Sequence, residues 1–229
     1  MIPSTEYPKI NTIFKRDEKG QIQMGQWSTP ELAYLMLNEW SWSEKIDGTN
    51  CRVIWDGSMV TFGGKTEQAQ MPTELGNRLI ALFKPQEDLF RQLWFPGPVV
   101  LYGEGYGPGI QKGGVYGDHQ DFILFDVRVG PWWLQRADVE DVAVKFGIKS
   151  VSTVGYGTLP EMAELIRDGG PKSAFGDFQA EGIVARPHCE LQTRGGERLI
   201  CKLKAKDFRT QGRGNGSWHP RSLPGSCRP

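Results

Sequence analysis

The chain has 229 residues, of which 38% are hydrophobic, and this length and composition suit a single folded domain. Its 27 Lys and Arg balance 27 Asp and Glu, so the formal net charge is zero, which excludes polyanion binding through an overall positive field. No apolar run reaches the roughly 20 residues of a membrane-spanning helix, and the four cysteines form no C-x-x-C pair of the kind found in zinc sites.

The first part of the chain predicts two β-hairpins with a helix between them. Residues 9–25 have short apolar stretches around a polar turn at Asp17–Gly20. Residues 29–39 begin with Thr-Pro and continue with leucines at helical spacing. The clearest hairpin is 50–63, where strands rich in Val, Ile, Trp and Phe flank an Asp56–Gly57 turn.

The remainder mixes helices and strands around a glycine-rich loop at 105–118. Helical patterns lie at 73–83, 86–94, 136–146 and 159–168, and strand patterns lie at 98–104, 121–129, 179–186 and 197–204. Because these elements alternate without a regular βαβ order, the sequence predicts an α+β fold.

The composition changes after Phe208 to Gly, Arg, Ser and Pro without periodicity. We therefore predict a folded domain over 1–208 and a basic Gly/Pro-rich tail, disordered, over 209–229. From Arg186 onward the chain carries a formal charge of +7, and the preceding part carries −7. A basic end on a neutral protein favours local binding of a polyanion, although a merely solvated tail explains the same charge.

Two familiar nucleotide-binding motifs are incomplete. Gly64-Lys65-Thr66 resembles the end of a P-loop, but the glycine that a P-loop requires at position 59 is Met59. The glycines between 103 and 109 alternate without forming G-x-G-x-x-G, so a Rossmann phosphate loop is unsupported.

The segment Glu44-Lys45-Ile46-Asp47-Gly48-Thr49-Asn50 lies where a strand meets the clearest hairpin. Alternation places Lys45 and Asp47 on one face of the extended segment. A lysine amine, once deprotonated, attacks phosphorus or a carbonyl carbon. The plainer interpretation of K-x-D-G by itself is a strand lysine paired with a neighbouring carboxylate.

Further polar and aromatic side chains follow in order along the chain. Glu104 ends an apolar strand, Phe125 lies in the next one, and Glu181 precedes a third. Lys202 and Lys204 share one face of a strand whose other face is apolar. Each has a plainer alternative, in which the phenylalanine is core, the glutamates lie at a rim and the lysines form a solvated face.

Taken together, this ordered set resembles the covalent nucleotidyltransferases, the superfamily of polynucleotide ligases and mRNA capping enzymes. Within it, E-K-I-D-G-T-N is most similar to the ATP-dependent RNA ligases of the second phage type and their bacterial and viral relatives. DNA ligases and capping enzymes usually carry an arginine where this chain has Asn50. The resemblance implies the nucleotidyltransferase fold, with mostly antiparallel sheets flanked by helices around an ATP cleft.

The resemblance implies a catalytic role for four residues. Lys45 would attack the α-phosphate of ATP and become lysyl-AMP, and Asp47 would support Lys45 or the later sealing step. Lys202 and Lys204 would stabilise charge on the transferring phosphoryl group.

The resemblance also implies the nucleotide contacts. Glu104 would hydrogen-bond the ribose, Phe125 would stack on adenine, and Glu181 would anchor Mg²⁺ or Mn²⁺. The nucleotide-binding set implied by the resemblance also includes Lys45, Lys202 and Lys204. Its remaining members are Glu44, Ile46, Asn50, Arg52 and Lys65.

The sequence departs from the family pattern at two places. Where relatives commonly have Arg followed by Thr or Ser, this chain has Lys65-Thr66, and lysine lacks the bidentate fork of arginine. Many relatives also append a domain after the last lysine motif, and we expect none here, so strand binding would fall to the surface of the core and the basic end.

We therefore expect an ATP-dependent RNA ligase that joins 3′-hydroxyl and 5′-phosphate ends through lysyl-AMP and adenylylated-RNA intermediates, in RNA or an RNA/DNA hybrid. The resemblance further implies a monomer without membrane contact, a cytoplasmic protein of phage or viral origin that acts in RNA repair. The alternatives are a minimal ATP-dependent DNA ligase, a capping guanylyltransferase and a catalytically silent nucleic-acid-binding module.

Overall fold

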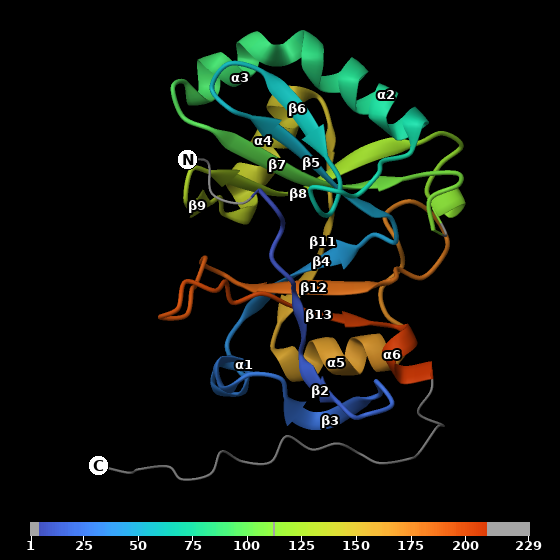
Figure 1. The fold of residues 1–229 in the computed structure, drawn as a ribbon. Helices are drawn as coiled ribbons and strands as arrows, with labels where there is room; N and C mark the ends of the chain where they lie inside the picture. The colour runs from blue at the N-terminus through green and yellow to red at the C-terminus, as the bar shows by residue number, and fades with distance from the viewer. Residues whose placement is uncertain (1–4, 112, 210–229) are drawn as a thin grey trace.

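The computed structural model describes residues 5–111 and 113–209, which form two large β-sheets stacked one above the other (Figure 1). The upper sheet has the strand order β10-β8-β7-β5-β6, with β9 paired to β8. Its strands are β5 (Thr49–Trp55), β6 (Val60–Gly63), β7 (Val99–Tyr106), β8 (Asp121–Val129), β9 (Trp132–Trp133) and β10 (Lys149–Ser150).

The lower sheet has the order β1-β13-β12-β4-β11. Its strands are β1 (Asn11–Thr12), β4 (Trp40–Lys45), β11 (Thr153–Gly157), β12 (Gly182–Pro187) and β13 (Cys201–Lys204). A separate hairpin of β2 (Phe14–Arg16) and β3 (Ile22–Trp27) lies below it. Pairing is antiparallel except between β1 and β13 and between β10 and β8, so the fold is α+β with mostly antiparallel sheets, as predicted.

The helices cover the outer faces of the two sheets. α2 (Thr73–Phe83) and α3 (Glu87–Trp94) lie over the upper sheet, and α5 (Leu159–Arg167) lies beneath the lower one (Figure 1). The remaining helices are α1 (Pro30–Leu35), α4 (Arg136–Phe146) and the short α6 (Lys206–Arg209). None of the helices in the described part of the chain has the length and apolarity needed to cross a membrane.

Each sheet has its own apolar core on its helix-covered face. The upper core packs Trp55, Phe83 and Phe122 among aliphatic side chains of β5, β7, β8 and the covering helices. The lower core packs Trp40 and Leu203 against α1, α5 and the β2–β3 hairpin. Since these faces are apolar, the alternate residues of the same strands point into the space between the sheets.

Local sequence signals explain most element boundaries. The side chain of Thr29 caps α1 by accepting a hydrogen bond from the backbone of Leu32, and Thr158 and Glu161 form a reciprocal capping box on α5. α2, α4 and β8 have the predicted bounds, whereas α1 ends at Leu35, earlier than expected. The predicted disordered tail over 209–229 lies, from residue 210 on, outside the described residues.

Candidate active site

The centre of the site is a carboxylate held between two lysines. Gly182 is paired with Lys45 on one side and with Lys204 on the other. β12 therefore lies between the strand that carries Lys45, β4, and the strand that carries Lys204, β13. Glu181 directly precedes Gly182 and reaches both: its Oε2 is 2.5 Å from Lys45 Nζ, and its Oε1 is 2.5 Å from Lys204 Nζ. All three side chains are mostly buried, with exposed fractions of 21%, 13% and 21% in the order Lys45, Glu181, Lys204.

The glycine at position 182 is required by close packing at this point. A Cβ there would lie 2.2 Å from the carbonyl oxygen of Leu203 and 2.8 Å from Cα of Lys204. The backbone of β13 therefore approaches β12 more closely than a side chain permits. This close approach brings Lys204 to the carboxylate that also holds Lys45.

The electrostatics of this cluster are dominated by four lysines. Burial would raise the pKa of Glu181, but the ammonium groups of Lys45 and Lys204 outweigh it and hold that pKa below its usual range. The pKa of Lys202 is lowered by burial, by Lys45 and Lys204, and to a smaller extent by Lys65. The ammonium groups of Lys45, Lys204 and Lys65 therefore each lie near enough to Lys202 to interact with it, and a polyanion is the ligand that such a cluster favours.

Glu104 lies close to Lys45 and Glu181 from the upper sheet, with Asn50 beside it. They are directly paired between β5 and β7, and the buried side-chain oxygen of Asn50 has no hydrogen-bond partner among the described residues. Burial raises the pKa of Glu104 to about 7, although the nearby charge of Lys45 opposes this. An unpaired amide oxygen and a desolvated carboxyl group are suited to accept hydrogen bonds from ribose hydroxyls.

The neighbours of Lys45 in sequence have different surroundings. β4 ends at Lys45, so the predicted alternation stops there, and Asp47 lies in the following bend, where its backbone N–H donates to the hydroxyl of Tyr116 at 3.1 Å. The side chain of Ile46 is buried in a third apolar cluster. Glu44 is also buried. It accepts hydrogen bonds from Ser173 Oγ at 2.6 Å and from the backbone N–H of Ala174 at 2.9 Å.

Arg52 is not brought among the lysines. It is 1% exposed, and its guanidinium donates to the Gly64 carbonyl at 2.7 Å, to Thr5 Oγ1 at 2.5 Å and to Glu67 Oε1 at 2.8 Å. Two of these partners, Gly64 and Glu67, lie on either side of Lys65, which is exposed. Arg52 thus holds the loop from which Lys65 reaches toward the lysine cluster.

Phe125 lies at an irregularity of the upper sheet. Tyr102 pairs with Asp126 and Gly103 pairs with Leu124, so Phe125 is the extra residue of a β-bulge and has no partner on β7. A bulge redirects a side chain away from the regular alternation. The ring is partly exposed and packs against the apolar cluster that contains Ile46, so two of the predicted nucleotide contacts belong to the same region of the interior.

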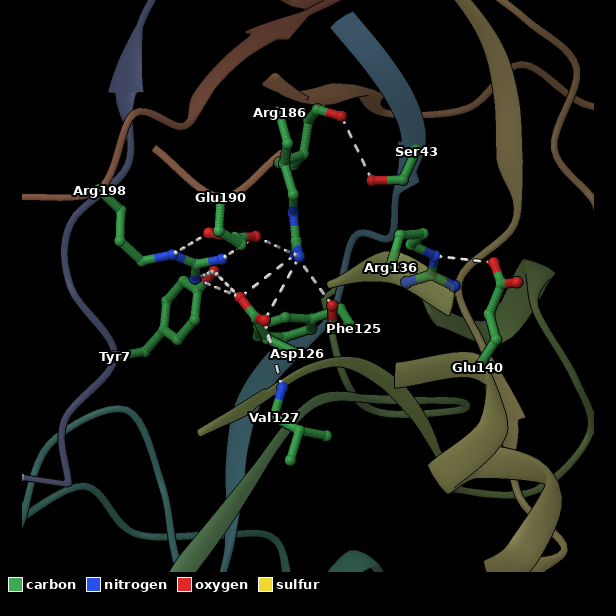
Figure 2. Close-up of polar contacts among 11 residues, drawn as sticks. Tyr7, Ser43, Phe125, Asp126, Val127, Arg136, Glu140, Arg186, Glu190 and Arg198 are labelled. Carbon is green, nitrogen blue, oxygen red and sulfur yellow. Dashed lines mark hydrogen bonds and ion pairs between the residues drawn. The ribbon is translucent and has the colours of Figure 1, made fainter. Parts of the chain in front are cut away.

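A buried ionic network lies behind Phe125, and sequence reasoning missed it (Figure 2). Asp126, which is completely buried, accepts hydrogen bonds from Arg186 at 3.2 and 3.3 Å, from Arg198 at 2.5 Å and from the Tyr7 hydroxyl at 2.7 Å. Glu190 accepts from Arg198 as well, at 2.8 and 3.0 Å. The available signal is an aspartate among the apolar residues of 122–127 in β8. A buried acid needs cationic partners.

The donor set suits a divalent ion that is bound mainly by a substrate. In residues 5–111 and 113–209 no three His, Cys, Asp or Glu side chains gather in a geometry that would hold a metal. Mg²⁺ characteristically binds through one or two carboxylates together with substrate phosphates and water. A single carboxylate among lysines fits that mode, and does not fit a resident metal held by protein ligands alone.

These contacts define what the site can do chemically. A partly buried lysine amine lies beside two further ammonium groups, opposite a carboxyl group and an unpaired amide oxygen. Phosphoryl transfer depends on this kind of positioning and charge neutralisation. The geometry therefore favours attack by Lys45 on a phosphate of a nucleotide.

Comparison with known proteins identifies a family to which the sequence matches and solved structures that share the fold. The family model described as RNA ligase matches residues 38–204. A solved structure of a Naegleria gruberi RNA ligase with PPi is similar, with 19% sequence identity, a TM-score of 0.61, and coverage of 88% of this chain and 62% of that chain. A variant of the same ligase with ATP and Mn matches with 18% identity and a TM-score of 0.59. Another variant, with AMP and Mn, matches with 20% identity and a TM-score of 0.60. Both matches cover 88% of this chain and 62% of the ligase chain.

Proposed function

Because this chain belongs to the RNA ligase family, we propose that it joins RNA ends in an ATP-dependent reaction that proceeds through a covalent lysyl-AMP. It spans about 62% of the length of the solved ligases that it matches. The observation that carries the proposal is the pairing of Lys45 and Lys204 through Glu181, opposite Glu104 and Asn50. The cluster combines a nucleophile, cations for phosphates and acceptors for a ribose.

The first step forms a nitrogen–phosphorus bond. Lys45 Nζ, after losing its proton, attacks the α-phosphorus of ATP, the bond to the β-phosphate oxygen breaks, and pyrophosphate leaves. Lys204, Lys202 and Lys65 neutralise the charge on the phosphates. With Lys204 paired to the triphosphate, an oxygen of Glu181 would be available to hold a Mg²⁺ or Mn²⁺ ion that is bound mainly by the substrate phosphates. Such an ion supplies additional neutralisation of phosphate charge.

The later steps transfer AMP and then release it. An oxygen of a 5′-phosphate end attacks the lysyl-AMP phosphorus and the nitrogen–phosphorus bond breaks. The leaving nitrogen takes up a proton from solvent, which returns Lys45 to the amine. The 3′-hydroxyl of the second end then attacks the activated 5′-phosphate, and AMP leaves as the phosphodiester bond forms. Glu104 and Phe125 hold the ribose and the adenine through all three steps.

The experiment is a test for the covalent intermediate. Incubation with α-labelled ATP and Mn²⁺ or Mg²⁺, followed by denaturation, should give a labelled protein that is stable to heat. Lys45→Arg keeps the charge next to Glu181 but removes the nucleophilic amine, so the label should fall by at least about 10³-fold. Lys9→Arg, at an exposed lysine outside the site, is the control and should label normally.

The outcomes separate the candidate functions. No label with ATP or GTP in the unsubstituted protein contradicts the proposed function, and label that persists in Lys45→Arg contradicts the choice of nucleophile. Label from GTP alone indicates a capping-type reaction. Sealing of nicks whose 3′-hydroxyl strand is RNA or DNA then tests whether a 2′-hydroxyl is required.

A further inference from the structure

The N-terminal segment Thr5–Tyr7 bridges two parts of the upper sheet that the proposed ATP site uses. In Figure 1 the described part of the chain begins at the upper sheet, runs down past the lower sheet and continues into the β2–β3 hairpin. At its top it contacts two structures far apart in sequence, the loop that carries Lys65 and the bulge that carries Phe125. None of these contacts has a role in the reaction steps above.

The first contact is made by Thr5 and Glu6. Thr5 Oγ1 accepts a hydrogen bond from Arg52 at 2.5 Å and donates to Glu67 Oε1 at 3.3 Å. Glu6 Oε1 accepts from the backbone N–H of Glu67 at 3.1 Å. Since Arg52 also holds the Gly64 carbonyl, the segment fixes both sides of Lys65.

The second contact is made by Tyr7. Its ring lies 5.1 Å from the ring of Phe125 at an interplanar angle of 79°, an edge-to-face arrangement, and 5.0 and 5.6 Å from the rings of Tyr102 and Trp133. Its hydroxyl donates to Asp126, the residue after Phe125, and Figure 2 shows it directed at that carboxylate. Burial together with Asp126 raises the pKa of Tyr7, so the hydroxyl remains a donor at neutral pH.

We infer that Thr5 and Tyr7 are positioning residues of the nucleotide site: the segment holds Phe125 and Lys65 in the arrangement that ATP requires. A bulge residue has no strand partner to fix its ring, so a packed neighbour must do so. An exposed loop lysine likewise depends on the hydrogen bonds of its loop. Both supports come from the same three residues, and this inference rests on the proposed function.

The test compares three variants in the full chain. Tyr7→Ala removes the ring and the hydroxyl, Tyr7→Phe removes the hydroxyl alone, and Thr5→Val removes the contact with Arg52. Tyr34→Ala is the matched control, because Tyr34 is 82% exposed on α1. The measurement is lysyl-AMP formation as a function of ATP concentration, at a temperature where circular dichroism shows every variant folded.

We expect the KM for ATP to rise about tenfold in Tyr7→Ala and Thr5→Val, with the maximal rate of adenylation changed less than about twofold. Tyr7→Phe keeps the ring against Phe125, so its KM for ATP should lie between that of Tyr7→Ala and that of the unsubstituted protein. A KM within about twofold of the control in both Tyr7→Ala and Thr5→Val overturns the inference, as does a loss confined to the maximal rate, because positioning of ATP affects its capture.

Hydrogen exchange without nucleotide keeps the inference testable if the protein forms no adduct or if Tyr7→Ala does not fold. In Thr5→Val the amides of 64–69 should exchange at least about tenfold faster, while those of 159–167 in α5 are unchanged. In Tyr7→Phe the amides of 121–129 should also exchange faster. Unchanged exchange in both segments overturns the inference, whereas absence of adduct in the unsubstituted protein contradicts only the proposed function.

Discussion

At the scale of single residues, the site is organised by the sharing of one carboxylate between Lys45, the proposed nucleophile, and Lys204, which we propose binds phosphate. Glu181 gives the lysine cluster an internal counter-charge while no polyanion is bound. Removing one partner from a desolvated ion pair is costly because the remaining charge stays buried. Binding of a triphosphate would supply the missing negative charge, and thereby release the carboxylate and Lys45.

Glu104 makes the stability of the protein depend on pH. Its folded-state pKa of about 7 lies above the usual value of a free glutamate, so the folded protein binds this proton more tightly than the unfolded chain. Its contribution to the free energy of unfolding is therefore fully present below about pH 4.3 and is lost as the pH rises through about 7.

Glu104→Gln keeps the shape of the side chain and removes the titration. We expect little change in the free energy of unfolding at pH 5 and a gain of about 1–3 kcal/mol at pH 8 relative to the unsubstituted protein. Urea titrations at both pH values measure this difference, with Glu18→Gln at the exposed turn of the β2–β3 hairpin as the control. If the difference in the free energy of unfolding between Glu104→Gln and the unsubstituted protein does not grow from pH 5 to pH 8, the raised pKa of Glu104 is contradicted.

At the scale of elements, the placement of the lysines depends on three adjacent strands of the lower sheet. β4 supplies Lys45, β13 supplies Lys202 and Lys204, and β12 lies between them. Because β12 and β13 pair in antiparallel register, Gly182 lies opposite Lys204, and the chain entering β12 brings Glu181 to both lysines. The register of these strands therefore determines the chemistry of the cluster.

Gly182→Ala tests this packing. The added methyl group meets backbone atoms of β13 at 2.2 and 2.8 Å, so we expect a loss of about 1–3 kcal/mol in the free energy of unfolding. Gly76→Ala, in α2 with nothing within 4 Å of the new methyl group, should instead gain about 0.5–1 kcal/mol. Chemical denaturation of the two variants in parallel measures both changes in the free energy of unfolding. Equal changes in the two variants would contradict the close approach of the β12 and β13 backbones at Gly182.

At the scale of the whole molecule, two sheets with separate cores are joined across a polar interior. Asp126 belongs to the upper sheet and Arg186 to the lower one, and Arg198 and Tyr7 reach the same carboxylate from two further segments (Figure 2). Burial would raise the pKa of Asp126, but the two arginines hold it below its usual range. The proposed nucleotide site thus lies beside a fixed ionic connection between the sheets.

Asp126→Asn removes the charge that two buried arginines share, and we expect a loss of about 3–5 kcal/mol at pH 7. The contribution of Asp126 is present above the ordinary aspartate pKa and is lost as the pH falls through its lowered folded-state value, so the difference should shrink in acid. Asp88→Asn breaks an exposed pair with Arg91 and should cost less than about 1 kcal/mol. Urea unfolding at pH 7 measures both, and similar losses would contradict a connecting role for Asp126.

The sequence by itself determined most of the elements, and the set of reactive side chains stays a prediction from it. Periodicity predicted 73–83, 121–129 and 136–146 with the bounds that the structure has, since amphipathic spacing and caps are local properties of the chain. The resemblance of Glu44-Lys45-Ile46-Asp47-Gly48-Thr49-Asn50 to the RNA ligases predicted the family that the family model identifies. β11 was missed, because Thr153–Gly157 contains two glycines and follows no clear alternation.

Only the tertiary structure decided which charges meet. Lys45 pairs with Glu181, 136 positions away, and not with a carboxylate of its own segment, and Arg52 supports a loop where a nucleotide contact was expected. Tyr7 and Asp126, 119 positions apart, had no sequence signal that linked them. The physical reason is that local propensity determines how each segment folds, whereas partners in a buried polar interior are determined by strand register, by packing and by the cost of leaving a buried charge unpaired.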